Sequence, residues 1–199
     1  MYIETNFLVG YASGRDPGAV DLLAAASKGI RLAVPGVCFM EALSLIEAER
    51  KRTHRLGDDL GNERRSAELD LVSSDSPGLA LRLAQAQSGV SKRFEVFSDR
   101  LDEVFLILSD VAEIISVSST VLRSHTDRKA IAEPTDNLIL ACILDHAADH
   151  HGTRKAFFSE NRKDFSQNTF VAGLLKDAGI KYFGQAAKLL EWAGSGSGA

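Results

Sequence analysis

Residues 1–10 read Met-Tyr-Ile-Glu-Thr-Asn-Phe-Leu-Val-Gly, a short apolar strand that leads into the acidic residue Glu4 and then into an apolar helical pattern. In α/β sheets, ligands bind in the crevice beyond the carboxyl ends of the strands, and Glu4 falls at such an end. A simpler interpretation is that Thr5 or Asn6 caps the following helix, with Glu4 favourable beside its positive end. The rest of the sequence is needed to choose between these two interpretations of Glu4.

Composition limits the class of protein. The 199 residues, 45% hydrophobic and 25% charged, suffice for one well-buried core of an ordinary globular protein. The formal net charge of -4 gives no overall attraction to nucleic acid, so local basic patches would have to bind a polyanion. Cys38 and Cys142 lie in apolar runs and predict buried free thiols in a reducing cytoplasm. Because no stretch resembles a signal peptide or a bilayer span, we expect a cytoplasmic protein with no membrane partner.

Short apolar strands alternate with helical patterns along the chain. We expect strands at residues 2–5, 31–36, 111–117, 155–158 and 180–183. This alternation predicts an α/β fold with a mainly parallel sheet and right-handed crossovers. Residues 1–193 are expected to form one domain, whereas residues 194–199 have linker composition and predict a flexible tail of the kind that cloning leaves.

Residues 54–110 predict a helical insertion in that domain, packed over or beside the sheet. The stretch is rich in charge and helix formers, and Gly57, Gly61, Pro77 and Gly89 predict breaks in it. Apolar residues recur every three or four positions between 94 and 108, which indicates an amphipathic helix. Basic residues at its two ends are either solvated charges or contacts for a phosphodiester backbone, and the candidates include Arg64, Arg65, Lys92 and Arg93.

Two more carboxylates lie near predicted strand ends. Glu41 falls in the early turns of a helix over residues 37–50, whose apolar stripe is predicted to use Phe39, Met40, Leu43 and Ile46; the alternative is a solvated glutamate. Asp136 follows Pro134 at the start of an apolar, buried helix. Either Asp136 caps that helix, or Thr135 does and leaves Asp136 free for a cluster of carboxylates.

The last polar signals follow the strand at residues 155–158. The turn after it brings Glu160, Asn161 and Asp164 to the strand end, with Arg162 among them as a candidate contact for a substrate. His146 and His150 are four residues apart on a helix, a spacing that can chelate zinc. The His-Glu-x-x-His order of zinc proteases is absent, so we interpret them as a surface pair.

Four segments together resemble a PIN domain, the fold of metal-dependent ribonucleases that include toxins of bacterial toxin and antitoxin pairs. They are Ile-Glu-Thr-Asn-Phe-Leu at 3–8, the helix with Glu41, Thr-Asp-Asn-Leu-Ile-Leu-Ala at 135–141 and Phe-Ser-Glu-Asn-Arg-Lys-Asp-Phe at 158–165. The resemblance covers residues 1 to about 185 and implies a Rossmann-like α/β/α sandwich. It also implies Mg²⁺ or Mn²⁺ in an acidic pocket and RNA as the substrate, with an antitoxin protein and a homodimer as further candidate partners.

By this resemblance, the catalytic and metal-binding residues are Glu4, Glu41, Asp136 and Asp164, and the supporting residues are Thr5, Asn6, Glu160 and Asn161. The family usually has aspartate where this chain has Glu4. The extra methylene moves the carboxylate oxygens by roughly 1.5 Å, which weakens a Mg²⁺ site or retunes it toward Mn²⁺.

A cluster of four carboxylates favours cation binding on physical grounds alone. Carboxylates that converge repel one another and raise each other's pKa values unless a cation is bound, and oxygen ligands select hard cations. The ion then polarises a phosphoryl oxygen and activates water. The alternatives are a phosphoacceptor or phosphatase on a related sheet, and a non-catalytic PIN-like module that binds RNA or protein.

Overall fold

The computed structural model describes residues 1–26 and 29–195. The chain forms two compact units: the sheet unit, Met1–Ala42 with Leu101–Ala199, and the hairpin unit, Leu43–Arg100. Of the tail expected at residues 194–199, Gly194 ends a helix and Ser195 caps it, whereas residues 196–199 lie outside the described residues.

The sheet unit contains a five-stranded parallel sheet in the order β3-β2-β1-β4-β5. The strands are β1 (Tyr2–Ile3), β2 (Leu32–Pro35), β3 (Ala112–Ile115), β4 (Lys155–Phe158) and β5 (Ile180–Phe183). The inner strands β1, β2 and β4 are buried almost throughout, as expected for parallel strands covered on both faces, whereas the edge strands β3 and β5 are partly exposed. The predicted α/β class and parallel sheet are therefore confirmed.

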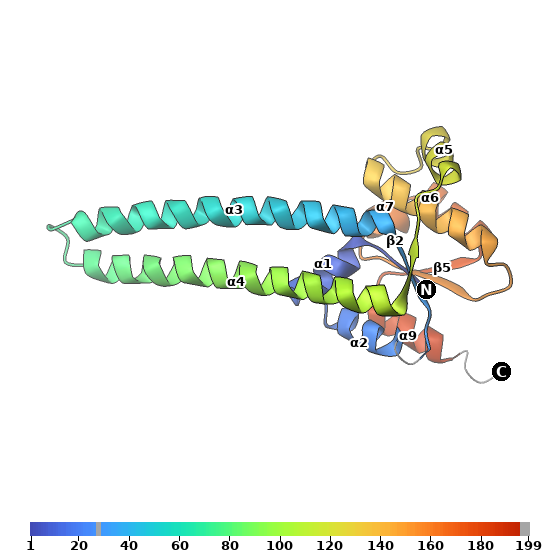
Figure 1. Ribbon diagram of the computed structural model, residues 1–199, viewed down its shortest axis with the longest axis horizontal. Coiled ribbons are helices and arrows are strands. Elements are labelled where there is room, and N and C mark those ends of the chain that lie inside the picture. The colour runs from blue at the N-terminus through green and yellow to red at the C-terminus, as the bar shows by residue number, and fades with distance from the viewer. Residues whose placement is uncertain (27–28, 196–199) are drawn as a thin grey trace. The chain divides into compact units, whose positions relative to one another are not determined.

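Helices cover both faces of this sheet. They are α1 (Thr5–Ser13), α2 (Pro17–Ala26), α5 (Ser119–Asp127), α6 (Pro134–Asp149), α7 (Arg162–Phe165), α8 (Thr169–Asp177) and α9 (Ala186–Gly194). Helix α2 packs against α9 on one face, and α5 packs against α6 on the other (Figure 1). The core between the layers includes Ile3, Leu140, Phe157 and Phe158, all almost completely buried.

The strand order reverses direction at β1, and this determines where a site can form. From β1 the chain crosses to β2 and then β3 on one side, and it returns to β4 and β5 on the other. At such a reversal the connections leave β1 and β4 on opposite faces and open a crevice at their carboxyl ends. Glu4 follows β1 and Ser159 follows β4 directly.

Two long helices, α3 (Gly36–Leu69) and α4 (Ser76–Val111), take the place of the predicted insertion with several breaks. The predicted breaks at Gly57, Gly61 and Gly89 are wrong, because both helices continue through these positions. Within the hairpin unit, the Gln87 amide donates to the Gly57 carbonyl at 2.9 Å, and it lies 3.2 Å from where a Cβ of Gly61 would stand. These glycines therefore allow α4 to approach α3 closely.

The predicted apolar stripe at the start of α3 is also partly wrong. Met40 is 64% exposed and Leu43 is 44% exposed, whereas Cys38 and Ala42 are buried. Cys38 and Ala42 are four residues apart and therefore share one face of the helix. Side chains this small let the backbone of α3 lie close to its neighbours, so the buried face is not the face with the largest residues.

Both cysteines are buried and unpaired by disulfide, as predicted. Burial is the main cause that raises the pKa of the Cys38 thiol, and it raises that of Cys142 to about 11, so neither is a reactive thiolate at neutral pH. Among the helices of residues 1–26 and 29–195, none is long and apolar enough to cross a membrane.

Candidate functional site

Glu4 is a buried carboxylate with two different oxygen environments. It is the N-cap of α1, and its Oε2 accepts a hydrogen bond from the Asn6 amide at 2.8 Å. Its Oε1 is buried and no donor meets it in hydrogen-bond geometry, although the Ser159 side chain lies close enough to lower the Glu4 pKa. Burial raises the pKa of Glu4 to about 7, with repulsion from Asp136 and Glu41 as smaller causes, while the Asn6 amide and the Ser159 side chain oppose the rise. Glu4 is thus both the helix cap and a candidate ligand.

Glu41 comes to the same place from α3. It is half-buried, and the Thr5 hydroxyl donates a hydrogen bond to its Oε2. Thr5 directly follows Glu4 and is itself buried, so the start of α1 fixes the Glu41 side chain. The solvated-glutamate alternative for Glu41 does not fit this contact.

Asp136 stands at the start of α6 but does not cap it. The cap is Glu133, whose Oε2 accepts a hydrogen bond from the Asp136 amide at 2.8 Å, so the prediction that Asp136 or Thr135 caps the helix is wrong. Pro134, the first residue of the helix, has no amide hydrogen and so needs no such partner. The Asp136 carboxylate is therefore available for other contacts.

Asn161 joins Asp136 to Asp164. Its Nδ2 donates to Asp136 Oδ2 at 3.0 Å and to Asp164 Oδ2 at 2.9 Å. Burial raises the pKa of Asp136 to about 6, followed by repulsion from Glu41, Glu133 and Asp164, whereas the bond from Asn161 lowers it. An amide that donates to two carboxylates holds them together although they repel each other.

The structure thus brings Glu4, Glu41, Asp136 and Asp164 together at the carboxyl ends of the strands. Glu4 interacts electrostatically with Asp136 and Glu41, and Asp136 with Asp164, in the interactions that raise their pKa values. Other predicted residues remain outside this acidic group. The Asn6 and Glu160 side chains are exposed. Their backbone atoms make hydrogen bonds near it: the Asn6 amide donates to Glu4, and the Glu160 carbonyl accepts from the Arg162 amide.

The predicted basic contacts lie in two places. Arg162 is exposed in α7, next to Asn161. The other four belong to the hairpin unit, where Arg64 lies 3.5 Å from Glu68 and Arg65 donates to Asn62 at 2.6 Å, while Lys92 and Arg93 are exposed. Such pairs between residues three or four apart are usual on solvated helices.

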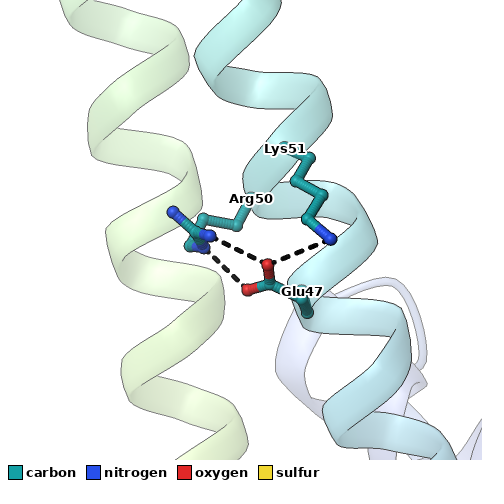
Figure 2. A network of polar contacts seen from close by, with 3 residues as sticks. All are labelled: Glu47, Arg50 and Lys51. Carbon is teal, nitrogen blue, oxygen red and sulfur yellow. Dashed lines mark hydrogen bonds and ion pairs between the residues drawn. The ribbon is translucent and has the colours of Figure 1, made fainter.

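A tighter pair of this kind lies earlier in α3. Figure 2 shows the Glu47 carboxylate between Arg50 and Lys51. Arg50 donates to both oxygens of Glu47, at 2.7 and 2.8 Å, and Lys51 lies 3.4 Å away. The guanidinium of Arg50 is therefore already engaged by a carboxylate.

Sequence reasoning missed three residues that shape the site. Ser159 is buried beside Glu4, and its hydroxyl accepts from the Asn161 amide at 3.0 Å. Buried Asn137 holds the loop before α6, because its Oδ1 accepts from the amides of Ala130 and Ile131. Glu133 caps α6. A signal existed for Ser159, the first polar residue after β4, and for Asn137, a polar residue within an apolar helix.

The acidic group fits a hard divalent cation. Its donors are carboxylate oxygens with an amide and a hydroxyl beside them, the ligand chemistry that Mg²⁺ and Mn²⁺ prefer. Glu4 Oε1, buried without a partner, is an atom that such a cation would satisfy. A different group, Glu113, His146 and His150, has one ligand atom from each residue within 4.8 Å of the others.

A parallel α/β/α fold with an acidic group at the reversal point of the sheet belongs to a class that includes many enzymes acting on phosphate compounds. A family model of the PIN domain matches residues 1–165, and the chain therefore belongs to the PIN domain family. PIN domains are generally nucleases and typically use divalent metals. No curated protein and no solved structure matches this chain.

Proposed function

We propose that this PIN domain is a divalent-metal-dependent endoribonuclease that hydrolyses RNA phosphodiester bonds. The observation that carries the proposal is the unpartnered Oε1 of Glu4, buried among interacting carboxylates. A buried anion without a counter-charge is costly, and its retention is explained if a cation compensates it.

In this proposal Glu4 and Asp136 hold Mg²⁺ or Mn²⁺, and Glu41 and Asp164 position a second ion or the attacking water. When bound, the cation supplies charge stabilisation at the phosphoryl oxygen. Thr5 orients Glu41 through its hydroxyl, and Asn161 orients Asp136 and Asp164 through its amide. These bonds fix the carboxylate oxygens before substrate arrives, as outer partners of metal ligands do.

The raised pKa values add a role for protons. With pKa values of about 7 and 6, Glu4 and Asp136 are partly protonated near neutral pH in the absence of metal. Metal binding requires deprotonated carboxylates, so it releases these protons. We therefore expect metal affinity to rise with pH until the pH exceeds the Glu4 pKa of about 7.

Glu4 itself supports a second candidate function. Its side chain is one methylene longer than the aspartate usual in the family, and a displaced ligand favours a non-catalytic module that binds RNA or a protein. An antitoxin protein and a second copy of the chain are the protein partners to test. For either function we place the protein in the cytoplasm, where Cys38 and Cys142 stay reduced.

Metal-dependent cleavage of RNA tests the proposal. A fluorescently labelled single-stranded RNA is incubated with the protein in Mg²⁺, Mn²⁺ or a chelator. Asp136→Asn is expected to lower the cleavage rate by at least about 100-fold, and Glu160→Gln, an exposed acid in the same turn, to leave it unchanged. Metal-dependent RNA binding without cleavage would favour the non-catalytic module, and cleavage that continues in the chelator would overturn the proposal.

A further inference from the structure

A second group of metal-ligating side chains lies at the other end of α6. Asp136 is in its first turn, whereas His146 and His150 are at its carboxyl end, where His150 is the C-cap. Ten residues of helix separate Asp136 from His146, about 15 Å along the axis. Glu113, the third member, comes from the edge strand β3. This group is thus distinct from the acidic group.

The contact between His146 and Glu113 has the spacing of two ligands of one ion. His146 Nε2 lies 3.1 Å from Glu113 Oε1, and this contact is the main cause that lowers the pKa of Glu113, although its angles do not meet hydrogen-bond geometry. With metal-ligand distances of about 2.0–2.1 Å, two ligands of a tetrahedral zinc ion lie about 3.3 Å apart. The His146 side chain is 13% exposed and that of Glu113 is 58% exposed, so the group opens to solvent on the carboxylate side.

Each of the two imidazoles uses one ring nitrogen in a contact within the protein. The His150 Nδ1 lies 2.9 Å from the His146 carbonyl oxygen, which can only accept, so Nδ1 carries the proton and Nε2 the lone pair. The His146 Nδ1 contacts the Tyr2 hydroxyl at 3.0 Å. Metal-binding histidines usually use their second ring nitrogen for such an outer contact, which fixes the ring and its tautomer.

We propose that Glu113, His146 and His150 form a binding site for Zn²⁺ or a similar late transition metal, with water completing the coordination. Imidazole ligands favour zinc, nickel and copper over Mg²⁺, so this site and the acidic group select different ions. A bound ion would link β3 to α6. The inference does not depend on the proposed nuclease function.

Binding of one ion by both histidines requires one of their rings to rotate. The rings of His146 and His150 are stacked, with centroids 4.1 Å apart and planes 18° from parallel. An ion lies close to the plane of each imidazole that ligates it, so one ring has to rotate out of the stack. His150, at the helix end, is the ring that turns, and in turning it gives up its Nδ1 contact with the His146 carbonyl oxygen. Its NMR signals are therefore expected to shift most on adding the ion.

Metal titration of the whole chain tests this site. Zn²⁺ affinity is measured at pH 7.5 in competition with a chromophoric chelator, and Co²⁺ reports ligand geometry by its visible absorption. Glu113→Gln and His150→Gln are each expected to weaken Zn²⁺ binding by more than about 100-fold, because loss of a direct ligand costs at least as much as loss of an outer partner. Tyr2→Phe is expected to weaken it by about tenfold.

A matched control separates this site from other metal binding. His54 lies 3.3 Å from Asp58 on an exposed face of α3, a histidine-carboxylate pair without a third ligand in that contact, so His54→Gln is expected to leave Zn²⁺ affinity unchanged. Parental Zn²⁺ affinity in both Glu113→Gln and His150→Gln would overturn the site. Circular dichroism establishes that each variant is folded.

Discussion

At the scale of single residues, Asp136 distinguishes a structural role from a ligand role. Glu133 caps α6, and the Asp136 carboxylate instead lies among acids and accepts from Asn161. Asp136→Asn keeps an oxygen for that bond and removes one repelling charge. Without metal, the free energy of unfolding is expected to rise by about 1 kcal/mol, the scale of one pKa unit. Urea denaturation in a chelator measures it, with Glu160→Gln as the exposed control. A less stable variant would contradict the assignment.

Glu4 gives a prediction for how the stability of the fold depends on pH. Its pKa rises from 4.5 in the unfolded chain to about 7 in the fold, so between these values the folded state keeps a proton that the unfolded state has lost. Stability without metal is therefore greatest below the lower value and falls as pH rises to about 7, by up to about 3 kcal/mol.

Glu4→Gln keeps an oxygen for the Asn6 amide and cannot ionise, so it isolates this effect. Denaturation of parent and variant in a chelator, between pH 4.5 and 8, is expected to give a flatter profile for the variant. The slope that remains in the variant belongs partly to Asp136, whose pKa also rises, to about 6. Parallel profiles for the two proteins would show that the fold does not raise the pKa of Glu4.

At the scale of elements, the strands were predictable and the longest helices were not. β4 and β5 fall at the predicted residues 155–158 and 180–183, because short apolar runs between turns leave few alternatives. The helix predicted to end at residue 50 continues to Leu69. Local pairs such as Glu47 with Arg50 and Arg64 with Glu68 support this polar stretch of α3, a contribution that apolar periodicity does not report.

The acids of the candidate site were predictable because they follow strands or lie in the early turns of helices. Glu4, Glu41, Asp136 and Asp164 stand in such positions, and the PIN resemblance gave their order along the chain. The contact of Ser159 with Glu4 depends on β4 lying next to β1, which no local pattern specifies. Glu133 was missed for another reason: serine, threonine, aspartate and asparagine are the usual caps, and glutamate is not.

The cap of α6 gives a prediction at this scale. Glu133→Ala removes the acceptor for the Asp136 amide and is expected to lower the free energy of unfolding by about 1 kcal/mol. Glu133→Ser retains an acceptor suited to the cap and is expected to lower the free energy of unfolding by less. Thr135→Ala is expected to have little effect, because Thr135 is not the cap. Chemical denaturation compares the three variants, and a larger loss from Thr135→Ala than from Glu133→Ala would restore Thr135 as the cap.

At the scale of the whole molecule, 27 acidic residues outnumber 23 basic ones, so the chain as a whole repels RNA. Affinity for RNA must then come from local basic residues that bind phosphates, and each such contact makes affinity depend on salt. Arg64 and Arg65 are candidates for such contacts. Arg64 lies 3.5 Å from Glu68, farther than a strong hydrogen bond, and Arg65 is bound to the neutral amide of Asn62. Arg50 and Arg52 are held by Glu47 and Glu49 at hydrogen-bond distance.

We therefore expect Arg64→Ala/Arg65→Ala to weaken binding of single-stranded RNA and to reduce the slope of log affinity against log salt by about 1.4, or about 0.7 for each phosphate contact. Arg50→Ala/Arg52→Ala removes the same charge from residues that already have carboxylate partners, and its slope is expected to match the parent. Fluorescence anisotropy in a chelator, at salt concentrations of about 50 to 200 mM, measures both. Equal losses of RNA affinity in the two double variants would mean that RNA binding depends only on net charge. Unchanged RNA affinity in Arg64→Ala/Arg65→Ala would mean that these two arginines are ordinary surface charges.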